Sequence, residues 1–129
     1  MRLLLPLFLA VPLMSGCSGD ESLSAYGGAG ESWTLKELNQ TAFETPATLN
    51  LTTPGEISGQ APCNSYRAQQ TAPYPWFEVK ALVTTRKACP VLEQERAYLS
   101  ALQSMSEAEI AGDVLILRND SGQEMIFTR

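Results

Sequence analysis

The residues best equipped for chemistry in this sequence are its three cysteines, Cys17, Cys63 and Cys89. The chain contains no histidine. This absence excludes Ser-His-Asp triads, Cys-His dyads and histidine-ligated metal sites. Cys63 and Cys89 lack the Cys-x-x-Cys spacing of redox-active pairs, so a structural bridge is favoured over redox activity. Two thiolates alone are also too few to hold zinc.

Three polar residues lie beside these two cysteines in the chain. Asn64 follows Cys63, and Thr85 and Arg86 come shortly before Cys89. A bridge would bring the three together as a candidate binding patch, in which Arg86 would hold an anionic or peptide ligand. The alternative, which we favour, is that they satisfy backbone groups in two turns and that Arg86 pairs with a carboxylate.

Two closely spaced pairs of acids could suggest hydrolytic chemistry, Glu93 with Glu95 and Glu107 with Glu109. A glycosidase holds its two carboxyl groups about 5–10 Å apart across a cleft, which sequence neighbours rarely achieve. We therefore interpret these acids as solvated. The sequence predicts no catalytic residue, no metal site and no cofactor, and hence a protein that is not an enzyme.

Residues 1–16 have the features of an export signal. Arg2 supplies a positive start, and residues 3–14 form an apolar run shorter than the roughly 20 residues that span a bilayer. Ser15-Gly16 before Cys17 resembles the lipobox of bacterial lipoproteins, in which the signal is cut before the cysteine and that cysteine carries the lipid. This resemblance implies an acyl chain such as palmitate on Cys17. The alternative is a plain secretory signal with Cys17 as a free thiol.

Export has consequences for location and for the other cysteines. Ser18, where aspartate would retain a lipoprotein, resembles the signal for sorting to the outer membrane of a Gram-negative bacterium, so we expect the protein on its periplasmic face. With Cys17 taken by lipid, Cys63 and Cys89 remain as a pair in an oxidising compartment, where structural disulfides persist. The chain has 9 basic and 14 acidic residues, a net charge of −5, which argues against a nucleic-acid partner.

Composition divides the remainder into a tether and one domain. Residues 17–32 are rich in serine, glycine, alanine and acids, which predicts a flexible tether. The alternative is a short ordered arm that docks Tyr26. The domain is expected at residues 33–129, because a chain of 129 residues with 44% hydrophobic and 18% charged residues is ordinary for one globular core.

One helix and several short strands must position the cysteines and their polar neighbours. Apolar residues recur at helical spacing over residues 91–105, and Pro90 suits the first helical position. Period-two alternation and turn residues predict strands at 33–38, 47–52, 56–59, 76–82, 108–111, 114–118 and 123–128, with a loop at 67–75. This pattern predicts an α+β fold that is mainly β, a small antiparallel barrel-like or curled sheet packed with a single α-helix.

Two motifs in this order resemble those of the META domain (HslJ-like) family. The first is Gly55-Glu56-Ile57-Ser58-Gly59 followed by Cys63-Asn64-Ser65-Tyr66, and the second is Thr85-Arg86-Lys87-Ala88-Cys89-Pro90. Residues 95–102 and the last two predicted strands also match. Pro62 and Lys87 depart from the family pattern, as does the lack of a glycine after Tyr66. The resemblance covers the chain from Trp33 onward and implies a small β-rich domain with a helix, associated with envelope stress and without an established catalytic mechanism.

The leading hypothesis is a non-enzymatic, lipid-anchored envelope protein that binds a partner or supports envelope integrity under stress. We expect it to be a monomer, held to the membrane through its N-terminal lipid and able to contact another envelope protein. A second hypothesis is an inhibitor of a periplasmic or extracellular hydrolase such as a lysozyme or protease, on fold analogy alone. A third is a small-ligand carrier with a pocket inside a barrel.

Overall fold

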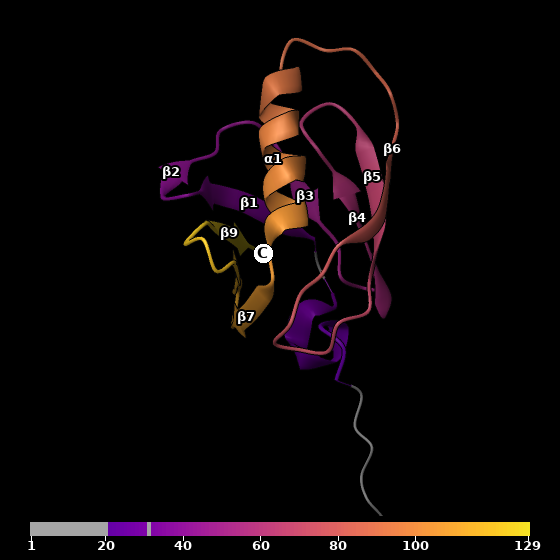
Figure 1. Ribbon diagram of the computed structural model, residues 1–129, viewed down its shortest axis with the longest axis vertical. Helices are drawn as coiled ribbons and strands as arrows, with labels where there is room; N and C mark the ends of the chain where they lie inside the picture. Colours follow the sequence, from indigo (N-terminus) through magenta and orange to yellow (C-terminus); the bar gives the residue numbers. More distant parts are fainter. Residues whose placement is uncertain (1–20, 31) are drawn as a thin grey trace, which may run out of the picture.

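The computed structural model describes residues 21–30 and 32–129, which form two antiparallel sheets and one α-helix (Figure 1). The expected signal at 1–16 and residues 17–20 of the expected tether lie outside the described residues. The elements are η1 (Ser24–Gly28), β1 (Trp33–Leu38), β2 (Thr41–Ala42), β3 (Thr48–Leu49), β4 (Gly55–Gln60), β5 (Ser65–Gln70), β6 (Lys80–Thr84), α1 (Leu92–Ser104), β7 (Glu107–Ala111), β8 (Val114–Arg118) and β9 (Glu124–Thr128).

The larger sheet has the order β2-β1-β9-β8-β7, and β3 pairs with the outer edge of β1. Alternate residues on these strands point to opposite faces, so each strand presents one apolar row to the interior. The β8–β9 hairpin keeps a regular register from Val114↔Thr128 to Arg118↔Glu124. The buried side chains of this sheet are Trp33, Leu35, Leu49, Ala108, Leu115, Leu117, Met125 and Phe127.

The smaller sheet has the order β4-β5-β6 and packs beside the first. A bridge between Asn50 and Ser58 connects the two sheets at β4. Gly59 permits this approach, because a Cβ there would clash with the carbonyl oxygen of Thr48. The fold is therefore α+β and antiparallel as predicted, but its strands do not close into a barrel.

Helix α1 covers the interior between the two sheets (Figure 1). Its side chain at Tyr98 is fully buried and contacts the rings of Phe43, Tyr66 and Phe127, with centroids 6.3, 5.7 and 6.5 Å apart. The prediction of a helix over 91–105 is confirmed to within one residue at each end. The helix begins after Val91, because Pro90 and Val91 form a turn before it.

Two of the predicted elements are wrong. Residues 65–70 form the central strand of the smaller sheet, although 67–75 was expected to be a loop. Its inward side chains are Tyr66, Ala68 and Gln70, so a buried glutamine and a small alanine weaken the apolar pattern. The strand expected at 76–82 starts only at Lys80, because residues 75–77 instead bond along the edge of β7.

Residues 21–30 do not behave as a flexible tether in the structure. They form an arm that packs against the domain, with Leu23 in the core and the Tyr26 ring stacked on Tyr74 at a centroid distance of 4.6 Å. The indole N–H of Trp33 donates to the carbonyl of Gly28 at 3.0 Å. This matches the alternative of a short ordered arm.

Arg129 holds the arm from the other side. Its guanidinium lies 4.3 Å from the centre of the Trp33 ring and donates to the carbonyls of Gly27 and Ala29 at 2.6 and 3.2 Å. A cation over an indole face is an attractive contact in its own right. The arm is thus part of the fold.

Candidate functional site

The disulfide predicted between Cys63 and Cys89 is present in the structure. Their Cα atoms lie 6.1 Å apart, and the bond joins the turn between β4 and β5 to the loop that leads into α1. It therefore brings the two sequence motifs together. Residues 85–90 are called the basic loop below.

Asn64 is the centre of the contacts between the two motifs and is 3% exposed. Its side-chain oxygen accepts hydrogen bonds from the backbone N–H of Lys87 at 2.7 Å and from the hydroxyl of Thr85 at 2.9 Å. Its amide nitrogen donates to the Glu95 carboxylate at 2.7 Å. Asn64 is thus fully used in holding the basic loop and is not available to a ligand.

Glu95 completes this network and is 4% exposed. Its Oε1 accepts hydrogen bonds from the backbone N–H groups of Cys63 at 3.0 Å and Asn64 at 2.6 Å. The expectation of a solvated acid is therefore wrong for Glu95. The signal that could have found it is helical spacing, because residues 95, 98 and 102 share the face of α1 that carries buried Tyr98 and Leu102.

The three residues of the expected binding patch have different roles in the structure. Thr85 accepts a hydrogen bond from the backbone N–H of Ser65 at 3.2 Å while donating to Asn64, so its hydroxyl is used internally. Arg86 is exposed, and its side chain has no hydrogen bond or ion pair within residues 21–30 and 32–129. The carboxylate partner expected for Arg86 is thus not found among those residues. Asn64 and Thr85 position the loop, and the Arg86 side chain remains exposed.

In the described part of the chain, half of the lysine and arginine side chains are paired with acids. Four cationic side chains, Lys36, Arg86, Lys87 and Arg96, have no ion pair in the described part of the chain, and three of them belong to the basic loop and the first turns of α1. The ion pairs present are Arg67–Glu56 at 4.0 Å, Lys80–Glu78 at 3.6 Å, Arg118 with Glu109 and Glu124 at 3.0 and 3.1 Å, and Arg129–Asp113 at 3.6 Å.

A depression of about 340 Å³ lies directly beside the basic loop on β5 and β6. It is lined by Ser65, Tyr66, Arg67, Val83, Thr84 and Thr85. Strand β6 is the end of its sheet, so its outer backbone groups have no strand partner among the described residues. An open strand edge next to unpaired cations can accept an extended, acidic peptide segment.

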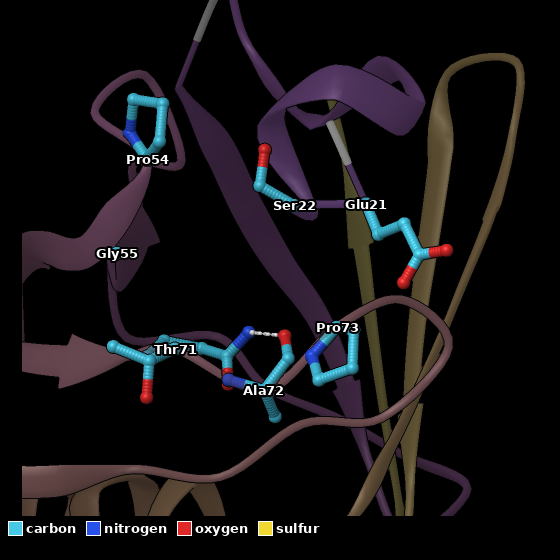
Figure 2. A pocket seen from close by; sticks show the side chains of 8 residues that line it. Glu21, Ser22, Pro54, Gly55, Thr71, Ala72 and Pro73 are labelled. Atoms are coloured by element: carbon cyan, nitrogen blue, oxygen red, sulfur yellow. Dashed lines mark hydrogen bonds between the residues drawn. The ribbon is translucent and has the colours of Figure 1, made fainter. Parts of the chain in front are cut away.

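Another depression, of about 410 Å³, lies at the opposite end of the molecule beside the start of the arm. Figure 2 shows Pro54 and Gly55 on one side, Thr71 to Pro73 on another, and Glu21 with Ser22 above them. The Gln70 side chain in its wall bonds to Ala72 and to the backbone N–H of Glu78, so it does not point a free group at a ligand. This depression has no set of converging polar groups.

Two buried tyrosine hydroxyls lie in the core between α1 and β5. Those of Tyr66 and Tyr98 are 2.6 Å apart, so one donates to the other, and they lie 2.7 and 3.1 Å from the carbonyl oxygen of Thr48, which accepts the remaining hydrogen. Burial raises the pKa of both phenols well above the ordinary value, and for Tyr98 the neighbouring Tyr66 raises it further. Both therefore stay neutral at physiological pH, and their role is to anchor the helix to β3 and β5.

Within the described part of the chain, no helix is long and apolar enough to cross a membrane. Over the same residues, no group of three Cys, Asp or Glu side chains is arranged to hold a metal ion.

Comparison with known proteins places the chain in a family and a fold. No curated protein matches it. A solved NMR structure of a protein from Burkholderia xenovorans is 26% identical, with a TM-score of 0.64 over 94% of this chain and 97% of that one. A crystal structure of a DUF4847 family protein from Bacteroides vulgatus is 9% identical, with a TM-score of 0.66 over 80% and 94%, and shows the fold alone. The model of the META domain matches residues 27–129, and the chain belongs to the META domain family.

Proposed function

We propose that this protein is a lipid-anchored, non-enzymatic binding module of the bacterial envelope, and that it binds a partner protein at the basic loop and β6. The observation that carries the proposal is Arg86, an unpaired cation on a loop that the disulfide and Asn64 hold in place. A rigid loop binds without losing much conformational entropy. The family resemblance favours a role in supporting the envelope under stress.

The position of the basic loop favours a partner away from the membrane. Figure 1 shows the loop that enters α1 at the top of the molecule and the arm with η1 at the bottom. A lipid on Cys17, four residues before the arm, would therefore hold the opposite end of the domain to the membrane. Arg86 would then project into the periplasm.

The chemistry of the site indicates an extended segment of a protein that carries acidic side chains. Main-chain hydrogen bonds to the open edge of β6 would give affinity, and Arg86 and Lys87 would select for carboxylates. Val83, which is 55% exposed on the outer face of β6, adds an apolar contact. Each of these groups lies beside the same 340 Å³ depression or next to it in the chain.

Site-specific photo-crosslinking in intact cells tests the binding surface. A crosslinker at position 86 or 83 should capture a discrete protein partner, whereas one at Asp120, in the exposed turn between β8 and β9, should not. Arg86→Glu should weaken the capture from position 83, and Lys36→Glu, at an unpaired cation on β1, should leave it unchanged. Equal capture from positions 83 and 120 would contradict the proposal.

The lipid anchor is tested separately. Cys17→Ala should move the protein from the membrane fraction to the soluble fraction, and the mass of the wild-type protein should include the acyl chains. A Cys17→Ala variant that still sediments with membranes would remove the anchor from the proposal and leave the binding surface untouched.

A further inference from the structure

We propose that the end of the domain formed by the arm and an aromatic turn rests on the bilayer that holds the lipid anchor. The aromatic turn is defined as Pro73, Tyr74, Pro75 and Trp76. This inference rests on the lipid anchor of the proposed function, and it adds a second membrane contact made by the folded domain itself.

Exposed aromatic surface is concentrated at this end. The large apolar side chains that stand out as exposed in the described residues are Tyr26 at 51%, Trp76 at 55% and Val83 at 55%. The first lies on the arm and the second on the aromatic turn, and the Tyr26 ring stacks on Tyr74 of that turn. Tryptophan and tyrosine favour the membrane–water interface, because their rings are apolar and their N–H or O–H groups remain hydrated.

The turn is held firmly to the larger sheet. The backbone N–H of Trp76 donates to the carbonyl of Pro73 at 2.8 Å, and the N–H of Ala108 donates to the carbonyl of Pro75 at 2.7 Å. The next residue, Phe77, is buried in the core. The Trp76 side chain is therefore exposed on a backbone that is held on both sides, by the hydrogen bond at Pro75 and by the buried Phe77.

The chain enters the fold beside this turn. The carbonyl of Glu21, the first described residue, accepts a hydrogen bond from the N–H of Tyr74 at 2.7 Å. Glu21 lies four positions after Cys17, and a fully extended chain of that length reaches about 14 Å. A bilayer that holds the acyl chains of Cys17 must therefore lie within a short distance of Tyr74, and Figure 1 shows the loop between β5 and β6 against η1 at this end.

The charge of the surface formed by the arm and the aromatic turn indicates which lipids it can contact. Residues 21–30 and 71–78 contain no lysine or arginine but include Glu21 and Glu78, and Glu107 forms a β-bridge with Trp76. The cations nearest to them are already paired, Lys80 with Glu78 and Arg129 with Asp113. A surface without an unpaired cation gains little from anionic lipids. The surface at this end therefore suits the uncharged interfacial region of zwitterionic lipids, with Trp76 and Tyr26 as the contacting rings.

Depth-dependent fluorescence quenching tests the contact. The full lipid-carrying protein is extracted from membranes and placed in phosphatidylethanolamine–phosphatidylcholine vesicles that contain a lipid with a nitroxide near its headgroup. Trp33 is fully buried, so the emission lost in Trp76→Phe reports on Trp76. As a matched probe, Val83→Trp in the Trp76→Phe background places an equally exposed indole on β6.

The quenching of Trp76 should be several-fold stronger than that of the indole at position 83. Added phosphatidylglycerol should not increase it. Equal quenching at both positions, or none at position 76 in protein whose mass shows the lipid, would overturn the membrane contact and leave the anchor intact. Trp76 shielded from a soluble quencher in native membranes, yet unquenched by the lipid, would show that a protein covers it. A mass without acyl chains would overturn the anchor and this inference together.

Discussion

The carboxylate of Glu95 accepts hydrogen bonds from both the backbone N–H and the side-chain amide of Asn64, at 2.6 and 2.7 Å. This pair joins α1 to the turn between β4 and β5 at the point where the disulfide joins the same turn to the basic loop. This buried carboxylate accepts three hydrogen bonds in all, and these charge-assisted bonds link two elements that are far apart in the chain. The conformation of the basic loop therefore depends on a residue that lies outside both sequence motifs.

Glu95→Gln should lower the free energy of unfolding by about 1–3 kcal/mol, because the new amide turns an N–H donor toward the donors of Asn64. Urea denaturation measures the change. Glu93→Gln is the matched control, since Glu93 is exposed and lies two residues before Glu95 in the first turn of the same helix. An equal loss in the free energy of unfolding in the two variants would show that Glu95 acts only through its charge at the N-terminus of the helix.

Removal of the disulfide by the double change Cys63→Ser, Cys89→Ser should lower stability by about 2–5 kcal/mol, because the bridge closes a loop across 26 residues of the unfolded chain. A reductant should destabilise the wild-type protein by a similar amount and leave the double variant unchanged. An unchanged melting temperature of the wild type in reductant would contradict a structural bridge.

Stability should fall in alkali because of Tyr66 and Tyr98. Burial raises the pKa of both phenols in the folded state, whereas in the unfolded chain they ionise at about 10. Above that pH the unfolded chain gives up protons that the folded chain retains, so the free energy of unfolding falls by about 1.4 kcal/mol per pH unit for each tyrosine until the folded pKa is reached.

Denaturation between pH 8 and the onset of unfolding measures this slope. The variant with Tyr66→Phe and Tyr98→Phe should show a shallower slope, whatever its stability at neutral pH. In the wild type, phenolate absorbance from these two residues should appear only as the protein unfolds. Parallel slopes for variant and wild type would mean that the two hydroxyls are not protected by the core.

Arg129→Ala should loosen the arm without unfolding the domain. The variant loses the hydrogen bonds to Gly27 and Ala29 and the contact with Trp33. Amide exchange at Gly28 and Ala29 should accelerate roughly 5- to 30-fold, as expected for a local loss of one to two kcal/mol. Arg67→Ala, which removes an exposed ion pair in the smaller sheet, should leave these amides unchanged.

The elements with strong periodicity could be predicted from the sequence. The apolar stripe of α1 and the alternation of β8 and β9 identify those elements, because their buried faces consist almost wholly of large apolar side chains. Strand β5 could not be found in this way, since Gln70 faces inward and is satisfied by backbone groups of Ala72 and Glu78, in the connection between β5 and β6. The apolar pattern of the sequence does not reveal that kind of compensation.

The candidate site likewise has residues that could be predicted from the sequence and residues that could not. Cys63 and Cys89 could be paired from compartment and count, and Asn64, Thr85 and Arg86 could be named from adjacency. That the side-chain amide of Asn64 is fully used depends on Glu95, whose burial becomes clear only when α1 is packed against the turn at Cys63. The order of the arm likewise depends on Arg129, about a hundred residues further along the chain.

The place of β1 in the larger sheet bears on how the protein would carry mechanical load. Strand β1 follows the arm directly and is bonded to β9 along one edge and to β2 and β3 along the other. Tension transmitted from a membrane anchor would detach the arm, and β1 is the first strand that it would then reach. Because three neighbouring strands share that tension, the strand closest to the pulling point is hydrogen-bonded along both edges, and the arm would detach before the load reached the basic loop.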